Sequence, residues 1–178
     1  MSTIRTRSAS DLDACVQVLK AVYDNDGYPV QGVEEARSFL SGDSIRQAWI
    51  CEKDDQIVGH VAASSKTPES DVSVALWTQE YSDDPSDIAV LERLFVDPYS
   101  RGLGIAGKLV DAAVAWSHER DMRLVLFALE KDRVAAKLYE RLGWSHFGTT
   151  TYHYDNGKTM AALCFVSPKA DEGEKVSY

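Results

Sequence analysis

The stretch VDPYSRGLGIAG, residues 96–107, decides how the chain is expected to fold. An apolar run, Ile88–Val96, leads into it and predicts a strand, and the pattern after it predicts a long amphipathic helix over Gly104–Asp121. A glycine-bearing turn between a strand and a helix exposes backbone N–H groups at the positive end of the helix dipole, where phosphates bind well. A side chain at Gly102 or Gly104 would hold a phosphate away from that backbone. The stretch therefore predicts a binding site for a diphosphate.

Two classes of diphosphate ligand fit this turn. Gly102, Gly104 and Gly107 spell the G-x-G-x-x-G pattern of dinucleotide-binding enzymes, and Glu130 ends the next strand, where a ribose-binding carboxylate would stand. Against that interpretation, the glycines begin several residues after Val96 instead of in a tight turn. Only about seventy residues follow Gly107, too few to complete two mononucleotide-binding halves. A dinucleotide enzyme is therefore the less favoured alternative.

Outward from this turn, the chain reads as one domain of strands and helices. Apolar and alternating runs predict further strands over Ile4–Arg7, Gln47–Glu52, Gln56–Ser64, Leu124–Leu129, Trp144–Tyr154 and Lys158–Val166. Helical patterns are found over Asp11–Tyr23, Val33–Leu40 and Val134–Leu142. We expect a single domain over residues 1–166 and a polar, disordered tail over residues 167–178.

The start of the first helix and one long connection carry more specific expectations. Ser10, with Asp13 three residues later, is expected to cap the first helix. The segment Ser65–Asp87 has no stable period, so it is expected to be a long loop with one short element at most. Its acidic residues are Glu69, Asp71, Glu80, Asp83, Asp84 and Asp87. The segment is interpreted either as an acidic lid that binds a substrate or as a solvated connection.

Charge and composition exclude several classes of protein. The 28 acidic residues outnumber the 19 basic ones, and a net charge of −9 would repel a phosphate backbone. A cationic small molecule is therefore a better partner than nucleic acid. No run approaches the length of a membrane span and the first residues lack an apolar signal region, so we expect a cytoplasmic protein without a membrane partner. Cys15, Cys51 and Cys164 fit neither a disulfide framework nor a metal site, and are expected to be reduced and buried.

Two motifs carry a specific resemblance. Leu94–Pro98 followed by Arg101–Ala106 resembles the R-x-x-G-x-A signature of the GNAT superfamily of acyl-CoA N-acyltransferases. Further along, Asp132–Trp144 resembles that superfamily's second signature, N-x-x-A-x-x-L-Y-x-x-x-G-F. The resemblance extends to the order of elements from the first strand to the final hairpin, which is nearly the whole chain apart from the tail.

The resemblance implies a fold and a cofactor. The fold is α/β (α+β), with a mixed, mostly antiparallel sheet of about seven strands flanked by about four helices, whose central strands splay apart. The co-substrate is acetyl-CoA, with its pantetheine arm along the strand and its pyrophosphate on the turn. The cofactor-binding residues implied are Leu94, Phe95, Val96, Arg101, Gly102, Leu103, Gly104, Ile105, Ala106, Gly107 and Asp132. Asp132 replaces the family's frequent asparagine, which keeps a helix-capping acceptor but loses an amide donor.

The activity implied is direct transfer of an acetyl group to an amine, with no nucleophilic side chain. The oxyanion would lie against a strand N–H near Val96. We expect an N-acetyltransferase that acts on the primary amine of a small molecule, as a monomer or a homodimer. Phe127 favours a small molecule, because some members that acetylate protein N-termini carry a glutamate base at that position. The alternatives are a protein or peptide N-acetyltransferase and a non-catalytic acyl-CoA-binding module.

The candidate catalytic residues each have a structural alternative. Tyr139 matches the second signature and would protonate the departing thiolate, but its helix face is apolar, which also fits plain packing. Glu92 has the same strand parity as Leu94 and is a candidate base, although it is equally placed to pair with Arg93. His60 is a second candidate base, and its alternative is a buried, hydrogen-bonded core residue.

Overall fold

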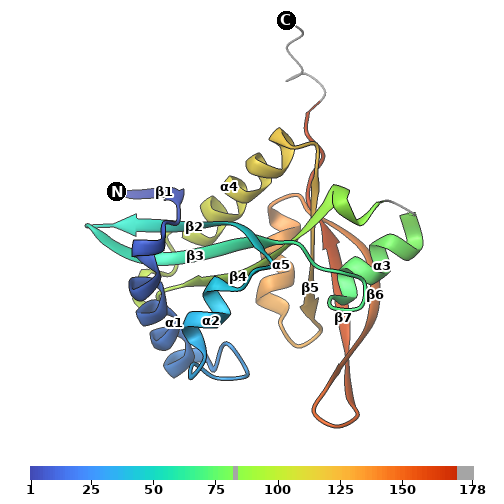
Figure 1. Cartoon of the computed structure of the whole chain (residues 1–178), viewed down its shortest axis with the longest axis horizontal. Coiled ribbons are helices and arrows are strands. Elements are labelled where there is room, and N and C mark those ends of the chain that lie inside the picture. The colour runs from blue at the N-terminus through green and yellow to red at the C-terminus, as the bar shows by residue number, and fades with distance from the viewer. Residues whose placement is uncertain (82–83, 172–178) are drawn as a thin grey trace, which may run out of the picture. The chain divides into compact units, whose positions relative to one another are not determined.

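The computed structural model describes residues 1–81 and 84–171. These residues form the strands β1 (Ser2–Thr6), β2 (Ile45–Lys53), β3 (Gln56–Ser64), β4 (Ile88–Val96), β5 (Arg123–Leu129), β6 (Ser145–Tyr154) and β7 (Lys158–Val166) (Figure 1). The α-helices are α1 (Leu12–Asp26), α2 (Ala36–Ser41), α3 (Val72–Tyr81), α4 (Ile105–Glu119) and α5 (Arg133–Arg141).

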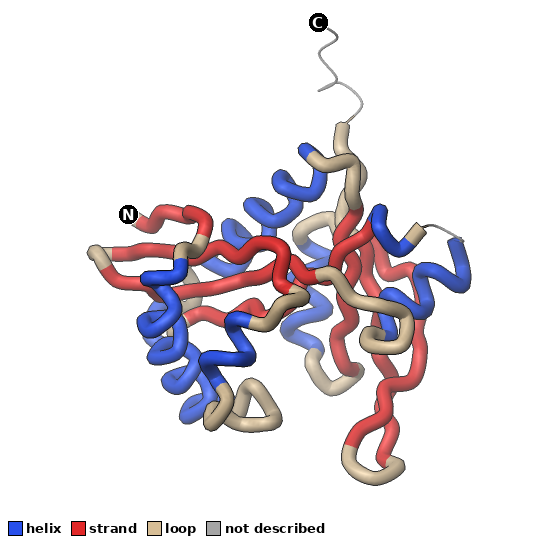
Figure 2. The backbone as a smooth tube through the Cα atoms, in the orientation of Figure 1, coloured by secondary structure: helices blue, strands red, loops and turns tan. Residues whose placement is uncertain are grey.

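The strands, drawn in red in Figure 2, build one seven-stranded sheet, and their order is β1-β2-β3-β4-β5-β7-β6. The ladders β1–β2, β2–β3, β5–β7 and β6–β7 are antiparallel. In contrast, β4 and β5 pair in parallel, from Ile88 opposite Arg123 to Val90 opposite Val125. A parallel pair needs a long crossover connection, which α4 supplies. The predicted mixed, mostly antiparallel α/β sheet of seven strands is thus confirmed.

The chain divides into two compact units, and the first comprises residues 1–65 and 91–113. In α1 the buried residues recur at steps of three and four, which gives the helix one apolar face. This face packs with α2 and with one residue each of β2 and β4. The resulting core comprises Leu12, Cys15, Leu19, Val22, Ala36, Leu40, Ile50 and Phe95. Because Phe95 belongs to this core, the packing of α1 and α2 holds the end of β4 in place.

The second unit comprises residues 66–90 and 114–178. Its core lies where α3 packs on the strands, and comprises Val74, Trp77, Ile88, Val90, Val125 and Val166, with Phe147 packed against it. The ring of Phe147 meets Trp77 edge-on at 5.2 Å between centroids. Gly148 lets Leu76 of α3 lie close to β6, because a Cβ there would lie 2.7 Å from Leu76 Cδ2.

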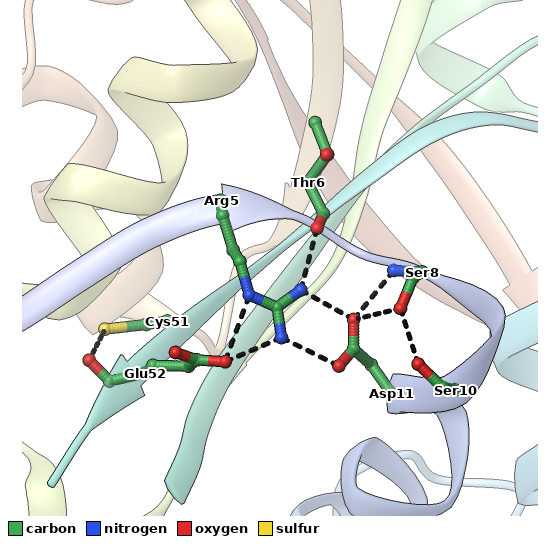
Figure 3. Close-up of polar contacts among 7 residues, drawn as sticks. All are labelled: Arg5, Thr6, Ser8, Ser10, Asp11, Cys51 and Glu52. Carbon is green, nitrogen blue, oxygen red and sulfur yellow. Dashed lines mark hydrogen bonds and ion pairs between the residues drawn. The ribbon is translucent and has the colours of Figure 1, made fainter. Parts of the chain in front are cut away.

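A charged network fixes the start of the first unit (Figure 3). The Arg5 guanidinium donates to both carboxylate oxygens of Asp11, at 2.7 and 2.8 Å, and to Glu52 Oε1 at 2.6 Å. The backbone N–H of Ser8 donates to Asp11 Oδ2 at 2.7 Å. The network therefore joins β1, β2 and the turn before α1, and Arg5 holds the pKa of the Asp11 carboxyl well below its usual value.

This network corrects the expected helix cap. The capping pair is Ser8 and Asp11, around a short 3₁₀ turn, and α1 begins at Leu12. Ser10 contacts only the hydroxyl of Ser8 in this group, at 2.9 Å. Both serines have an aspartate three residues later, so spacing alone does not choose between them. The pair Ser8 and Asp11 forms the cap because Arg5 binds the Asp11 carboxylate.

Two further expectations are corrected. The segment Ser65–Asp87 is not simply a loop, because it contains the ten-residue helix α3. Asp71 caps α3 by accepting from the N–H groups of Ser73 and Val74, at 2.9 and 3.2 Å. Ser167, the first residue of the predicted disordered tail, is ordered, because it is buried and its Oγ accepts from the Leu124 N–H at 2.9 Å. Asp83, and residues 172–178 of the predicted tail, lie outside the described residues.

We predict that Asp11→Asn lowers the free energy of unfolding by about 1–2 kcal/mol at pH 7, because it removes the charge that Arg5 binds. The pKa of Asp11 is depressed in the folded state, so its stabilising effect is present above about pH 4 and is lost as the pH falls below that value. Urea denaturation at pH 7 and pH 3 checks both statements, since the variant's deficit shrinks at pH 3. The matched control is Asp13→Asn, an exposed carboxylate that pairs with Arg37 and should change stability by less than about 0.5 kcal/mol.

Candidate active site

The end of β4 presents a row of backbone groups along one edge. The Asp97 N–H donates to the Val58 carbonyl of β3 at 2.8 Å, so Asp97 faces β3. Successive residues of a strand direct their N–H and C=O groups to opposite edges. The N–H and C=O groups of Val96 and Leu94 therefore lie on the edge that does not face β3, where an extended ligand can bind them.

The glycine turn after β4 contains two left-handed residues. Gly102 and Gly104 have φ values of 79° and 76°, a region that favours glycine. The first hydrogen bond of α4 runs from the Lys108 N–H to the Gly104 carbonyl at 3.2 Å. The N–H groups of Ile105–Gly107 precede that bond, so they are the donors that a helix N-terminus offers to an anion.

A glycine that the sequence analysis overlooked positions this helix. Gly59 lies on β3, and a Cβ there would come within 3.0 Å of Leu109 Cδ1 and 3.1 Å of Ile105 Cγ2. The missing side chain lets the first turns of α4 approach β3 closely. A glycine inside a strand pattern is the signal that could have indicated this close approach.

Arg101 has a partner that the sequence did not reveal. Its guanidinium forms a two-point ion pair with Asp26, the last residue of α1, in which Nη1 donates to Oδ1 at 3.2 Å and Nη2 to Oδ2. Its Nε donates to the Val96 carbonyl at 3.4 Å. The ion pair lowers the pKa of Asp26, which keeps this carboxyl ionised. Arg101 therefore contacts both the end of α1 and the end of β4.

Glu92 is held by hydrogen bonds in the first unit. Its Oε1 accepts from the Ser64 hydroxyl at 2.7 Å and from Arg93 Nη1 at 2.8 Å, and both side chains of the ion pair are mostly buried. Arg93 in turn donates from Nε to the Phe39 carbonyl at 2.6 Å and stacks on the Phe39 ring. Glu92 therefore forms the ion pair with Arg93 that the sequence analysis gave as the alternative to a catalytic role. The catalytic role of Glu92 stays a prediction.

His60 is a fully buried side chain with partners for both ring nitrogens. Arg7 Nη1 lies 2.9 Å from Nε2, and the Arg93 carbonyl lies 2.9 Å from Nδ1. The ring stacks on Phe95 at 5.0 Å between centroids. Burial lowers the pKa of His60 to about 4, so the imidazole is neutral at pH 7. A buried core histidine describes this geometry better than a general base does.

The second unit holds the residues of the second signature. Asp132 caps α5, because its Oδ1 accepts from the Ala135 N–H at 3.3 Å, as the sequence predicted. Tyr139 is buried, and its ring packs against Trp144 and Phe165 at 5.2 and 6.2 Å between centroids. These contacts are compatible with a packing role for Tyr139, and its catalytic role stays a prediction.

The structure thus brings Glu92 together with Leu94–Gly107 in the first unit, whereas Asp132, Tyr139 and Phe127 lie in the second. Phe127 packs against Tyr152 at 5.2 Å between ring centroids. Most of the predicted residues lie in strands, in helices or at helix caps, whereas Arg101–Gly104 form the turn before α4.

The three cysteines are free and buried. Burial raises the pKa of the Cys15 thiol to about 11 and that of Cys164 to about 12, and it also raises the pKa of Cys51. None of them therefore supplies a thiolate at neutral pH. Within residues 1–81 and 84–171, no group of acidic, histidine and cysteine side chains could hold a metal ion. No helix in the described part of the chain is long and apolar enough to cross a bilayer.

A pocket of about 340 Å³ opens in the first unit beside α2. It is lined by Gln31, Gly32, Glu34, Glu35, Ser38 and Phe39. The carboxylates give it negative charge, and Phe39 is the residue that contacts Arg93. Phe39 therefore contacts both the pocket and Arg93, and Arg93 is the ion-pair partner of Glu92 on β4.

One family model matches most of the chain. Residues 15–144 match the model of the acetyltransferase (GNAT) family. An uncharacterized N-acetyltransferase of Methanocaldococcus jannaschii is 27% identical over 147 residues, which is 80% of this chain; the chain spans about 60% of that relative's length.

Solved structures are similar to the chain at low identity. An N-acetyltransferase from Staphylococcus aureus Mu50 matches at a TM-score of 0.69 and 18% identity, over 93% of this chain and 97% of that one. The ribosomal-protein-S18-alanine N-acetyltransferase from Escherichia coli matches at 0.68 and 18%, over 100% of both chains. Arabidopsis thaliana NAA60, in complex with acetyl-CoA, matches at 0.68 and 19%, over 93% of this chain and 97% of that one. These similarities show the fold.

We predict that the imidazole of His60 stays neutral, with its proton on Nδ1, from pH 8 to pH 5. Its folded pKa of about 4 lies below the ordinary 6.5, so its stabilising effect is complete above pH 6.5 and falls by about 3 kcal/mol toward pH 4. Nitrogen-15 NMR of the imidazole measures the protonation state, and loss of the signal in His60→Asn assigns it. Urea denaturation of both proteins measures the stability difference. A His60 midpoint near pH 6.5 would contradict the prediction.

Proposed function

The chain belongs to the acetyltransferase (GNAT) family, and we propose that it transfers an acetyl group from acetyl-CoA to the primary amine of a small molecule. One observation carries the proposal. The outward-facing backbone groups of Leu94 and Val96 lead directly into the left-handed glycines and the N-terminus of α4. Acetyl-CoA matches this sequence of groups, because its amide-bearing pantetheine arm can pair with a strand edge and its pyrophosphate suits the turn.

In the proposed reaction, the acceptor amine attacks the thioester carbonyl directly. An alkylammonium has a pKa near 10, so it first loses a proton, for which Glu92 is the proposed base. Attack forms the C–N bond and a tetrahedral intermediate, with its oxyanion against the Val96 N–H. The nitrogen then loses its second proton to water, and the intermediate collapses as the C–S bond breaks. Tyr139 is proposed to donate a proton to the departing thiolate. The raised thiol pKa values of Cys15, Cys51 and Cys164 are consistent with a mechanism that has no cysteine nucleophile.

Two features of the chain support a small, cationic acceptor. Glu34 and Glu35 line the pocket beside α2, and carboxylates attract an ammonium group or a second positive charge on the acceptor. Phe127 packs on Tyr152 and offers no carboxylate at its position. A cytoplasmic location is part of the same proposal, and the free, buried cysteines are consistent with it.

We predict saturable binding of acetyl-CoA and none of NADH in calorimetric titrations, followed by thiol release when an amine panel is added. Gly104→Ala should weaken acetyl-CoA binding at least tenfold, because a Cβ would separate the pyrophosphate from the turn. The matched control is Gly157→Ala in the β6–β7 hairpin. Gly157 also has a positive φ and, like Gly104, has no atom within 4 Å of a Cβ, so both variants place a side chain on a strained backbone without a clash. A wild-type protein that binds NADH but not acetyl-CoA would overturn the proposed function.

We predict that Tyr139→Phe lowers kcat at least 100-fold if the hydroxyl is the proton donor, a loss typical of a general acid. The phenylalanine ring keeps the packing against Trp144 and Phe165, so the free energy of unfolding should change by only about 1 kcal/mol. Steady-state thiol release and urea denaturation give the two values. Tyr81→Phe, a half-exposed tyrosine of the same unit, is the control. Full activity in Tyr139→Phe would leave packing as the role of this residue.

A further inference from the structure

One residue in β4 has an unusual backbone conformation. Arg93 has a φ of 55°, in the left-handed region, although it is not a glycine and lies inside a strand. A residue with a Cβ persists there only when surrounding contacts hold it. On the side-chain end, the guanidinium binds the Phe39 carbonyl and the Glu92 carboxylate. On the backbone end, the Arg93 carbonyl is bound by His60.

The hydrogen bonds of His60 allow only one tautomer. A guanidinium has no acceptor, so Arg7 donates and His60 Nε2 accepts, at 2.9 Å. A carbonyl has no proton to give, so Nδ1 carries the hydrogen and donates to the Arg93 carbonyl, also at 2.9 Å. The neutral imidazole is completely buried and is fixed face to face on Phe95. The side chain thus supplies a hydrogen-bond donor to the carbonyl of the left-handed residue.

This contact sets the direction of the next backbone donor. The carbonyl of Arg93 and the N–H of Leu94 belong to one planar trans peptide group, so they point in opposite directions. When His60 holds the carbonyl, the Leu94 N–H must point away from the imidazole. Further along the strand, the bond from the Asp97 N–H to Val58 fixes the backbone again. The segment that carries the Leu94 and Val96 donors is therefore held at both ends.

We propose that His60 is a positioning residue that orients the Leu94 N–H for the pantetheine arm of acetyl-CoA, through its Nδ1–H bond to the Arg93 carbonyl. The role rests on the proposed function, because it requires the cofactor to bind along Leu94–Val96. The second hydrogen bond, from Arg7 to Nε2, fixes the tautomer and anchors the ring to the residue that directly follows β1.

Two substitutions separate the two hydrogen bonds of His60. The amide nitrogen of His60→Asn stands in the place of Nδ1 and can still donate to the Arg93 carbonyl. The amide of His60→Gln reaches the place of Nε2 and can still accept from Arg7, but it lacks the donor at Nδ1. Both variants remove one buried hydrogen bond, so they should lose comparable stability.

Calorimetric titration with acetyl-CoA, together with steady-state kinetics, tests the role. We expect His60→Asn to bind acetyl-CoA within about threefold of the wild type, and His60→Gln about tenfold more weakly. The KM for acetyl-CoA should rise in His60→Gln by the same factor, with the KM for the amine unchanged. If His60→Gln does not fold, His60→Phe takes its place, because it keeps the stack on Phe95 and also lacks the Nδ1 donor.

The outcomes distinguish the two proposals. Equal affinity loss in His60→Asn and His60→Gln, or no loss in either, would overturn the positioning role while the wild type still binds acetyl-CoA. Failure of the wild-type protein to bind acetyl-CoA would overturn the proposed function, and the positioning role with it.

Discussion

The orientation of the peptide group between Arg93 and Leu94 is the constraint on which the candidate site depends. If this part of β4 were a regular strand, the backbone groups of its odd-numbered residues would bond directly to the backbone of β3. Arg93 has a left-handed conformation, and the imidazole of His60 binds its carbonyl. The segment from Leu94 to the glycine turn therefore takes its direction from this contact and from the bond of Asp97 to Val58.

Holding that peptide group requires a buried polar network, and such networks are stable only when their members find partners. Arg7, His60 and Arg93 form a chain from the end of β1 across β3 to β4, and Arg93 continues it to Phe39 of α2. Across the described residues, every buried side-chain nitrogen or oxygen has a hydrogen-bond partner. The polar network and the apolar core around Phe95 therefore support the same stretch of β4.

The sequence predicted the elements whose signals are local. The bounds of β4 were predicted to the residue, because an apolar run ends at Asp97-Pro98, and the Asp132 cap was read from its position before α5. Helix α3 was missed, because its apolar residues show no helical period. The partners of the site residues were missed for a different reason. Asp26 lies 75 positions from Arg101, and Arg7 lies 53 from His60, and nothing in either neighbourhood indicates such a pairing.

The fold also decides between the two interpretations of the glycine motif. Locally, β4, the turn, α4 and β5 form a parallel pair with a helical crossover, which is the unit that also binds dinucleotides. A dinucleotide site needs a second such unit beside the first. Here β5 is followed in the sheet by antiparallel β7 and β6, and the ladders that join β1, β2 and β3 are antiparallel. The described residues hold no second unit of this kind, so the proposed ligand is one that continues along the strand that precedes the turn. Acetyl-CoA is such a ligand, because its pyrophosphate is joined to a flexible arm that carries amide groups able to pair with a strand edge.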